Sequence, residues 1–275
     1  MQDYEYELVG KIGSMALIRR EDNDIDYNII ARLGEQLKPG MIWVSSGAAE
    51  IGRLDYLKRR GEELTGDPAD IKTDYAAQGQ AILMAEYRRF IRPAYSVRQV
   101  LVEHQHFNDA EKREHIRRLL LRAREQQAIP IVNYNDPVSD EENRKWELAH
   151  LRSTQEQVVE CVDNDETAAV IAGLVRARTL LIMTSTEGLY RDLRDPSTLV
   201  REVAGRDAEE VLRNIRKLQK SCVGASRPGA NGMHAKLEFA AGPVSRGTTV
   251  IIAHAHHRID ALLDGTAPAT RIGVI

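Results

Sequence analysis

The chain has 275 residues, 43% of them hydrophobic and 29% charged, which is enough to bury a large core in one domain or in two lobes. Its formal net charge of −3 excludes a broad basic field for nucleic acid or an anionic membrane, so any bound anion must be held locally. The chain has only two cysteines, so we expect no disulfide framework. Its N-terminus lacks the basic and apolar regions of a signal peptide, and we therefore expect a cytoplasmic protein.

Short apolar, β-branched runs alternate with longer stretches of helical period along most of the chain. The predicted strands are 6–12, 41–45, 97–102, 129–133, 179–184 and 248–253. The predicted helices are about 25–37, 47–60, 72–92, 110–127, 164–177, 207–218 and 232–246, and the charged stretch 136–162 predicts a loop with one short helix. This alternation is typical of an α/β fold, a three-layer sandwich in which helices cover both faces of a central, mostly parallel sheet.

Polar and glycine-rich turns follow several of the predicted strands. Ligands in such folds gather at the carboxyl ends of the strands, so these turns are the first candidates for a binding site. Lys11 stands in a run that otherwise indicates buried strand and tight turn, and a lysine there needs a partner or a ligand. Ser45-Ser46-Gly47 precedes a predicted helix, where a serine can also serve as an N-cap.

The stretch 224–236 is a glycine-bearing loop that runs into a predicted helix and places Lys236 near its first turn. Backbone N–H groups at a helix start, helped by the macrodipole and an ammonium, form a site for phosphate. Glycines also cap and connect helices for purely structural reasons, so the loop alone leaves both interpretations open.

Four polar residues, Asp163 to Glu166, precede another apolar helix. Acidic residues at a helix start are favoured by the macrodipole in any protein. Four in a row exceed what capping requires, and a carboxylate between two lysines would hold both ammoniums toward one point. The interpretation as a site is therefore preferred to capping alone.

The histidines form two groups, His104 with His106, and His254 with His256 and His257. Neither group shows carboxylate or cysteine companions at metal-ligand spacing, so we expect loop or interface histidines and no metal site in the protein. The nucleotide-binding G-x-x-x-x-G-K-[ST] and G-x-G-x-x-G motifs and the G-x-S-x-G elbow are missing. Two lysines, an acidic helix start and glycine turns remain, a set that suits phosphoryl transfer from a nucleotide.

A series of motifs, in the same order over about residues 6–265, resembles that of the amino acid kinase family. The matching segments are 11–14, 45–53, 78–80, 107–109, 131–138, 163–165, 184–190 and 229–236. The resemblance implies a carbamate kinase-like fold in a single kinase domain, with a substrate lobe at about 1–160 and a nucleotide lobe at about 161–275. A homo-oligomer, dimer or tetramer, is also expected, without a nucleic-acid or membrane partner.

The resemblance also implies a role for individual residues. Lys11 and Lys236 would stabilise the transferring phosphoryl group, and Asp165 would orient the two lysines. The amino acid would be held by Ser46, Gly47, Asp136, Asp163 and Asn164. The nucleotide side would comprise Gly13, Ser14, Thr184, Ser185, Gly188, Tyr190, Gly232 and Met233. The implied reaction uses ATP with Mg²⁺ and phosphorylates a carboxylate of a small amino acid, foremost the side chain of L-glutamate, to give glutamyl 5-phosphate and ADP.

The chain departs from the family pattern at three positions. Tyr134 stands where the family has glutamate, Val162 where it has glycine and Ser185 where it has aspartate, and roughly a dozen extra residues lie between 135 and 163. Two alternatives therefore stay open. One is a kinase of the same fold that acts on a phosphate or phosphonate, which an extra cation such as Arg53 or Arg144 would favour. The other is a nucleotide- or anion-binding protein without catalysis.

Overall fold

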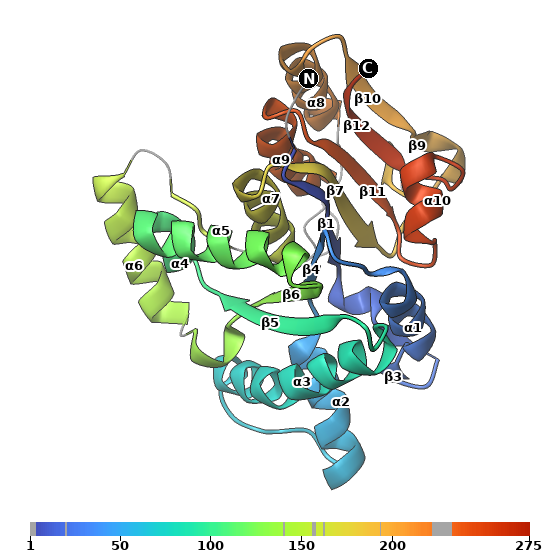
Figure 1. Ribbon diagram of the computed structural model, residues 1–275. Coiled ribbons are helices and arrows are strands. Elements are labelled where there is room, and N and C mark those ends of the chain that lie inside the picture. The colour runs from blue at the N-terminus through green and yellow to red at the C-terminus, as the bar shows by residue number, and fades with distance from the viewer. Residues whose placement is uncertain are drawn as a thin grey trace.

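The computed structural model describes residues 4–19, 21–139, 141–155, 158–161, 163–192, 194–221 and 233–275. An eight-stranded sheet crosses these residues in the order β10-β12-β11-β7-β1-β4-β6-β5 (Figure 1). Its strands are β1 (Tyr6–Ile12), β4 (Met41–Ser45), β5 (Ser96–Val102), β6 (Ala128–Tyr134), β7 (Ala177–Thr184), β10 (Glu202–Gly205), β11 (Thr249–His254) and β12 (Thr270–Val274). Two small ribbons join β2 (Ile18–Arg19) to β3 (Asp24–Ile25) and β8 (Leu189–Tyr190) to β9 (Leu199–Val200).

Neighbouring strands of the large sheet are parallel, except that β11 and β12 run antiparallel. Successive residues of β1 belong to two different cores: Val9 packs into the core on one face and Leu8 into the core on the other. Both faces are therefore covered, which explains why the central strands are continuous apolar runs and do not alternate with polar residues.

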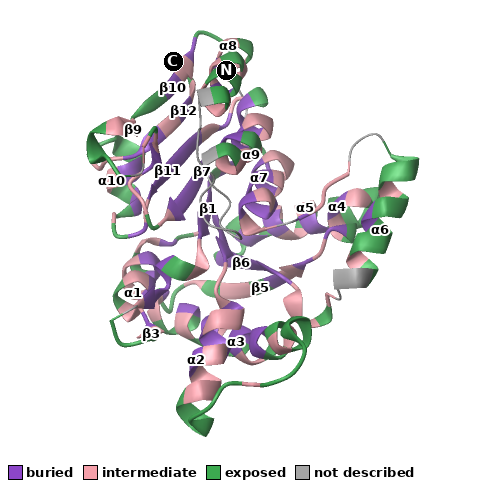
Figure 2. Cartoon of the chain, turned by 180° about the vertical axis from the view of Figure 1, so that it is seen from behind, coloured by how far each residue is buried: buried purple, intermediate pink, exposed green. Residues whose placement is uncertain are grey.

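Helices cover the two faces. One face carries α1 (Tyr27–Gln36), α2 (Ala48–Arg60), α3 (Pro68–Phe90) and α10 (Ile259–Asp264). The other carries α4 (Gln105–Asn108), α5 (Ala110–Glu125), α7 (Asn164–Leu174), α8 (Ala208–Ser221) and α9 (Met233–Ser245). Figure 2 shows the buried residues concentrated on the central strands and on the helix surfaces that face them. The α/β fold with a mostly parallel central sheet is confirmed, and each of the predicted strands and helices is present.

Some elements differ from the prediction. The stretch predicted as a loop with one short helix contains α6 (Glu141–Thr154), a helix of 14 residues. Its side chains are mostly polar, so an apolar stripe is too weak to reveal the full length. The strands β10 and β12 and the helix α10 were not predicted, because elements of four to six residues carry little periodicity.

The N-terminal strand β1 lies in the middle of the sheet, between β4 and β7 (Figure 1). The predicted substrate and nucleotide lobes, 1–160 and 161–275, consequently share one sheet, and the division between them stays a prediction. Because β1 pairs with strands from both halves of the chain, residues at its carboxyl end contact segments that are far away in sequence.

Candidate active site

Three turns meet at the carboxyl end of β1. Ile12 is in register with Ser45 of β4 and with Met183 of β7, so the three parallel strands end at the same level. The backbone N–H of Gly13 donates to the carbonyl of Met183 at 3.2 Å, and the N–H of Ser46 donates to the carbonyl of Ile12 at 3.2 Å. The polar turns that follow these strands are therefore side by side, as ligand-binding turns are in open α/β sheets.

Gly47 allows the second of these turns to approach the first. It has φ +99 at the start of α2, a conformation that side chains rarely adopt. A Cβ at Gly47 would lie 3.3 Å from Leu17 Cδ1 and 3.6 Å from the Cα of Ser14. A glycine at this position thus satisfies both the backbone conformation and the close contact.

Lys11, Asp165 and Lys236 form one cluster. Nζ of Lys11 lies 2.5 Å from Oδ1 of Asp165, and Nζ of Lys236 lies 2.6 Å from Oδ2 of the same carboxylate. The three side chains come from β1, the first turn of α7 and the first turn of α9. Lys11 and Asp165 are 8% and 2% exposed. The two ammoniums from opposite ends of the chain therefore converge on one carboxylate.

Two effects of opposite sign act on Asp165. Burial raises the pKa of this carboxyl, but the ammoniums of Lys11 and Lys236 outweigh burial and hold the pKa below its usual value. Asp165 is thus ionised at neutral pH. These three side chains by themselves carry one net positive charge, which favours an anion beside the lysines, and the carboxyl of Asp163 also interacts with Lys11.

Asp163 has a different contact pattern. Its Oδ1 accepts hydrogen bonds from the backbone N–H groups of Asp165 and Glu166 at 2.8 and 2.9 Å, so it is the N-cap of α7. Burial raises the pKa of Asp163 above its usual value. The two interpretations of residues 163–166 therefore apply to different residues. Asp163 caps the helix, and Asp165 contacts the two lysines.

Asn164 connects the cluster to the turn after β4. Its Nδ2 lies 2.9 Å from Ser46 Oγ and 3.1 Å from Asn133 Oδ1. Asn133 in turn donates to Gln80 Oε1 at 2.8 Å. Asn133 and Gln80 were not among the predicted site residues. For Asn133 a signal exists, because a polar side chain in the otherwise apolar strand β6 needs a partner.

Other predicted site residues lie in separate contacts. Asp136 forms an ion pair with Lys72 of α3 at 3.5 Å. The hydroxyls of Thr184 and Thr186 are hydrogen-bonded to each other, and Ser185 is exposed. Gly188 packs against Thr270, where an added Cβ would lie 2.5 Å from the Oγ1.

Four predicted residues of the nucleotide side remain. Ser14 begins a short 3-10 turn after β1, and Tyr190 lies in β8. Gly232, the side chain of Met233, Val162 and the loop 224–232 lie outside the described residues. The structure therefore brings Lys11, Lys236, Asp165, Asn164 and Ser46 into one network.

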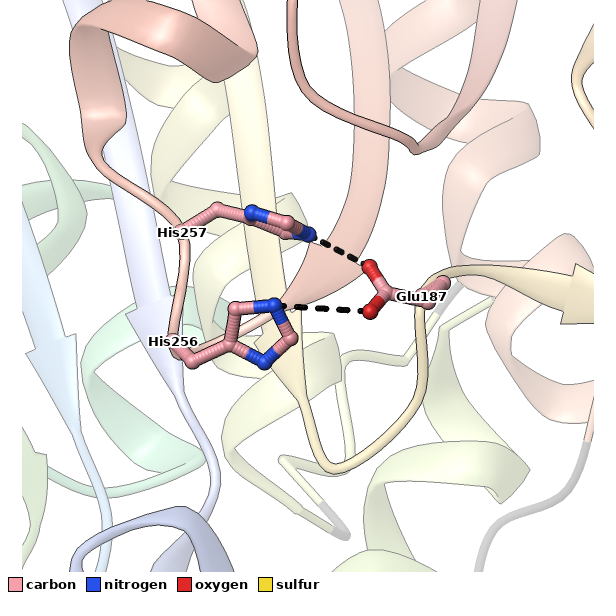
Figure 3. A group of neighbouring side chains, drawn as sticks. All are labelled: Glu187, His256 and His257. Atoms are coloured by element: carbon pink, nitrogen blue, oxygen red, sulfur yellow. Dashed lines mark hydrogen bonds and ion pairs between the residues drawn. The ribbon is translucent and has the colours of Figure 1, made fainter.

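Both groups of histidines have a carboxylate companion, which the sequence did not show at ligand spacing. Oε2 of Glu187 lies 2.5 Å from Nε2 of His257, and Oε1 lies 3.4 Å from Nε2 of His256 (Figure 3). The contact joins positions 70 residues apart, because the turns after β7 and β11 are neighbours, and spacing in the sequence cannot reveal it. In the first group, buried His104 lies 2.9 Å from Glu147 of α6.

The amino acid kinase family profile matches residues 8–254. This chain belongs to the amino acid kinase family. Glutamate 5-kinase of Gloeobacter violaceus is 32% identical over 97% of this chain and 68% of that protein. Glutamate 5-kinase of Alkaliphilus metalliredigens is 30% identical over 96% of this chain and 94% of that protein. The enzyme of that name from Dehalococcoides mccartyi is 30% identical, and the match spans only 60% of its length.

Solved structures show the same fold. Carbamate kinase from Giardia lamblia bound to AMP-PNP superposes over 100% of both chains with a TM-score of 0.61 at 14% identity. UMP kinase from Ureaplasma parvum superposes over 98% of both chains with a TM-score of 0.55 at 11% identity. The carbamate kinase-like fold is thus confirmed, and family and fold together support an enzyme of the phosphotransferase class. Among the described residues, no helix is both long and apolar enough to cross a bilayer.

Proposed function

We propose that this protein transfers the γ-phosphoryl group of ATP to a carboxylate of a small amino acid, foremost the side-chain carboxylate of L-glutamate. The observation that carries the proposal is the pair of ammoniums, Lys11 and Lys236, held on the two oxygens of Asp165. Relatives named glutamate 5-kinase, 30% to 32% identical over most of the chain, support glutamate as the first acceptor to test.

The proposed reaction is a direct transfer. An oxygen of the acceptor carboxylate attacks the γ-phosphorus, the bond to the β–γ bridging oxygen breaks, and ADP leaves with that electron pair. Negative charge on the transferring group lies close to Lys11 and Lys236, whose ammoniums stabilise it. Asp165 offsets the repulsion between the two ammoniums and fixes their positions before the reaction begins.

The surrounding residues suggest where each substrate lies. The Asn164–Ser46 contact is on the proposed acceptor side, and the turns at Gly13 and Thr184 are on the proposed nucleotide side. In this proposal the acceptor and the γ-phosphate meet above the carboxyl end of β1, beside Lys11.

Mg²⁺ fits this site as part of the nucleotide. Both oxygens of Asp165 are engaged by lysines, and Asp163 caps α7. Asp165 and Oδ1 of Asp163 are therefore already engaged, and Mg²⁺ that arrives bound to ATP would supply further charge neutralisation.

The contacts of two arginines favour a carboxylate acceptor over a phosphate. Arg53 is paired with Glu50 at 2.7 Å and with Glu63 at 2.6 Å. Arg144 donates to the carbonyls of Glu160 and Cys161 at 2.8 and 2.6 Å. An acceptor phosphate would have to displace these partners, whereas a carboxylate carries less charge to neutralise.

The test is ADP release from ATP with L-glutamate, with the acyl phosphate trapped as a hydroxamate. Lys236→Ala is expected to lower kcat by about 10²- to 10³-fold, because a charge stabiliser of the transition state is lost. Lys217→Ala, which removes an exposed lysine of α8, is the matched control and should keep full activity. The proposal is wrong if no small carboxylate yields ADP above background, or if both variants behave alike.

A further inference from the structure

Glu187, His256 and His257 form a cluster next to the proposed nucleotide side. Glu187 lies in the turn after β7, and the two histidines lie in the turn between β11 and α10 (Figure 3). The two turns are in contact, because the N–H of Ala255 donates to the carbonyl of Thr184 at 2.9 Å. The cluster is therefore built from two loops that the parallel pairing of β7 and β11 places together.

The geometry of the cluster fits a metal ion. One ligand atom from each of the three side chains lies within 4.8 Å of the others. Two ligands on the same Zn²⁺ are about 3 to 4.5 Å apart at bond lengths of about 2.0–2.2 Å, so small side-chain movements would close the site. Figure 3 shows both imidazoles directed toward the carboxylate of Glu187.

All three side chains are partly exposed to solvent. Side-chain exposure is 28% for Glu187, 49% for His256 and 18% for His257. An ion can therefore enter without unfolding of the loops, and water can occupy a remaining coordination position.

The donor set decides which class of metal fits. Two imidazoles and one carboxylate suit Zn²⁺, Co²⁺ or Ni²⁺, whereas Mg²⁺ prefers oxygen ligands alone. Two histidines and a glutamate with an open fourth position are a known ligand set of zinc enzymes.

The turn that carries the two histidines is also held by a backbone contact. The backbone N–H of His256 donates to Nδ1 of His254 at 3.1 Å, which fixes this part of the turn.

We propose that Glu187, His256 and His257 bind one divalent transition-metal ion, with Zn²⁺ as the best fit. The ion joins the turn after β7 to the turn after β11 and so stabilises the loop that leads to Gly188. Arg32 donates to the carbonyl of Ala255 at 2.7 Å and adds positive charge nearby. Glu187 is the compensating carboxylate, so its loss is expected to weaken binding more than the loss of one histidine.

The experiment is a titration of chelator-treated protein with Zn²⁺ by calorimetry and with Co²⁺ by visible absorption, without nucleotide. About one equivalent is expected, with the cobalt spectrum of an imidazole- and carboxylate-bound ion. His256→Ala and His257→Ala should each weaken binding by about tenfold or more, and Glu187→Gln by a larger factor. His115→Ala, which removes an exposed histidine of α5, is the matched control and should bind as the parent does.

Two results would overturn the proposal. One is the lack of saturable binding of either ion by the parent protein, which involves no variant that could fail to fold. The other is unchanged stoichiometry and affinity in the Glu187→Gln and His257→Ala proteins, which would place the metal elsewhere. Because no ATP is present, the outcome is separate from the kinase proposal: an active enzyme without the metal site, or the reverse, can be recognised directly.

Discussion

The pKa of the Asp165 carboxyl is set by burial, which raises it, and by two ammoniums, which lower it. Its neighbours Lys11 and Lys236 reach it from β1 and α9, and each occupies a different oxygen. Removal of the carboxylate charge would leave two cations close together in a mostly buried place, where water screens their repulsion poorly. The same residue therefore contributes to folding and to the proposed chemistry.

Asp165→Asn is expected to lower the free energy of unfolding by about 3 kcal/mol, because a buried charge pair loses one partner. Urea unfolding followed by circular dichroism measures the change, and the ADP-release assay should show a large loss of kcat. Asp163→Asn is the matched control, since asparagine is also a good N-cap, and it should cost less than about 1 kcal/mol. If both variants lose the same free energy of unfolding, the charge pairs of Asp165 do not contribute more to stability than the N-cap does.

Helices α2 and α3 cross at two glycines. A Cβ at Gly79 would lie 1.8 Å from the carbonyl oxygen of Ala48, and a Cβ at Gly52 would lie 1.8 Å from that of Tyr75. The backbones therefore touch. This approach places Gln80, the residue after Gly79, where it can accept the hydrogen bond of Asn133, so the crossing supports the polar network around Asn164.

Gly79→Ala is expected to force the two helices apart and to lower the free energy of unfolding by about 2 kcal/mol or more. Thermal and urea unfolding measure the effect. Gly242→Ala in α9 is the control, because an added Cβ there meets no atom within 4 Å outside its chain neighbours. Its stability should change by less than about 1 kcal/mol, since the helix preference of alanine and its crowding against the following Pro243 oppose each other. If Gly79→Ala is as stable as the parent, the helices adjust without cost and the crossing does not depend on glycine.

At the scale of the whole molecule, α6 is attached to the sheet through polar contacts. His104, which is buried, lies 2.9 Å from Glu147 of α6. Arg144 of α6 donates to the carbonyls of Glu160 and Cys161, and its guanidinium lies over the ring of Tyr134. Burial lowers the pKa of His104, the carboxylate of Glu147 opposes this effect, and the guanidinium of Arg144 adds to it.

Stability is therefore expected to fall as the pH decreases below about 6.5, the pKa of histidine in the unfolded chain. Below that pH the unfolded chain binds a proton at His104 that the folded protein does not take up until its own, lower pKa is reached. The pKa values of His254 and His256 are also lowered and act in the same direction. Urea unfolding between pH 7 and pH 5 should show a smaller decrease for His104→Asn than for the parent, and an unchanged decrease for His115→Asn.

Local sequence patterns were sufficient to predict much of the candidate site. Lys11 stands out as a charge at the end of a buried strand, and Lys236 as a cation at a helix start after glycines. The Gln80–Asn133 contact and the Glu187–His257 contact could not be predicted in this way, since each joins positions at least 53 residues apart. The short strands β10 and β12 were missed for another reason, because four or five residues carry too little periodicity.

The sequence alone determines the type and order of the main helices and strands, because the periodicity of buried side chains is a local property of each segment. It also determines which side chains stand at the strand ends. Only the tertiary structure decides which of these side chains meet. The strand order β7-β1-β4 brings the carboxyl ends of three strands to one place, and the packing of α7 and α9 then sets Asp165 between Lys11 and Lys236.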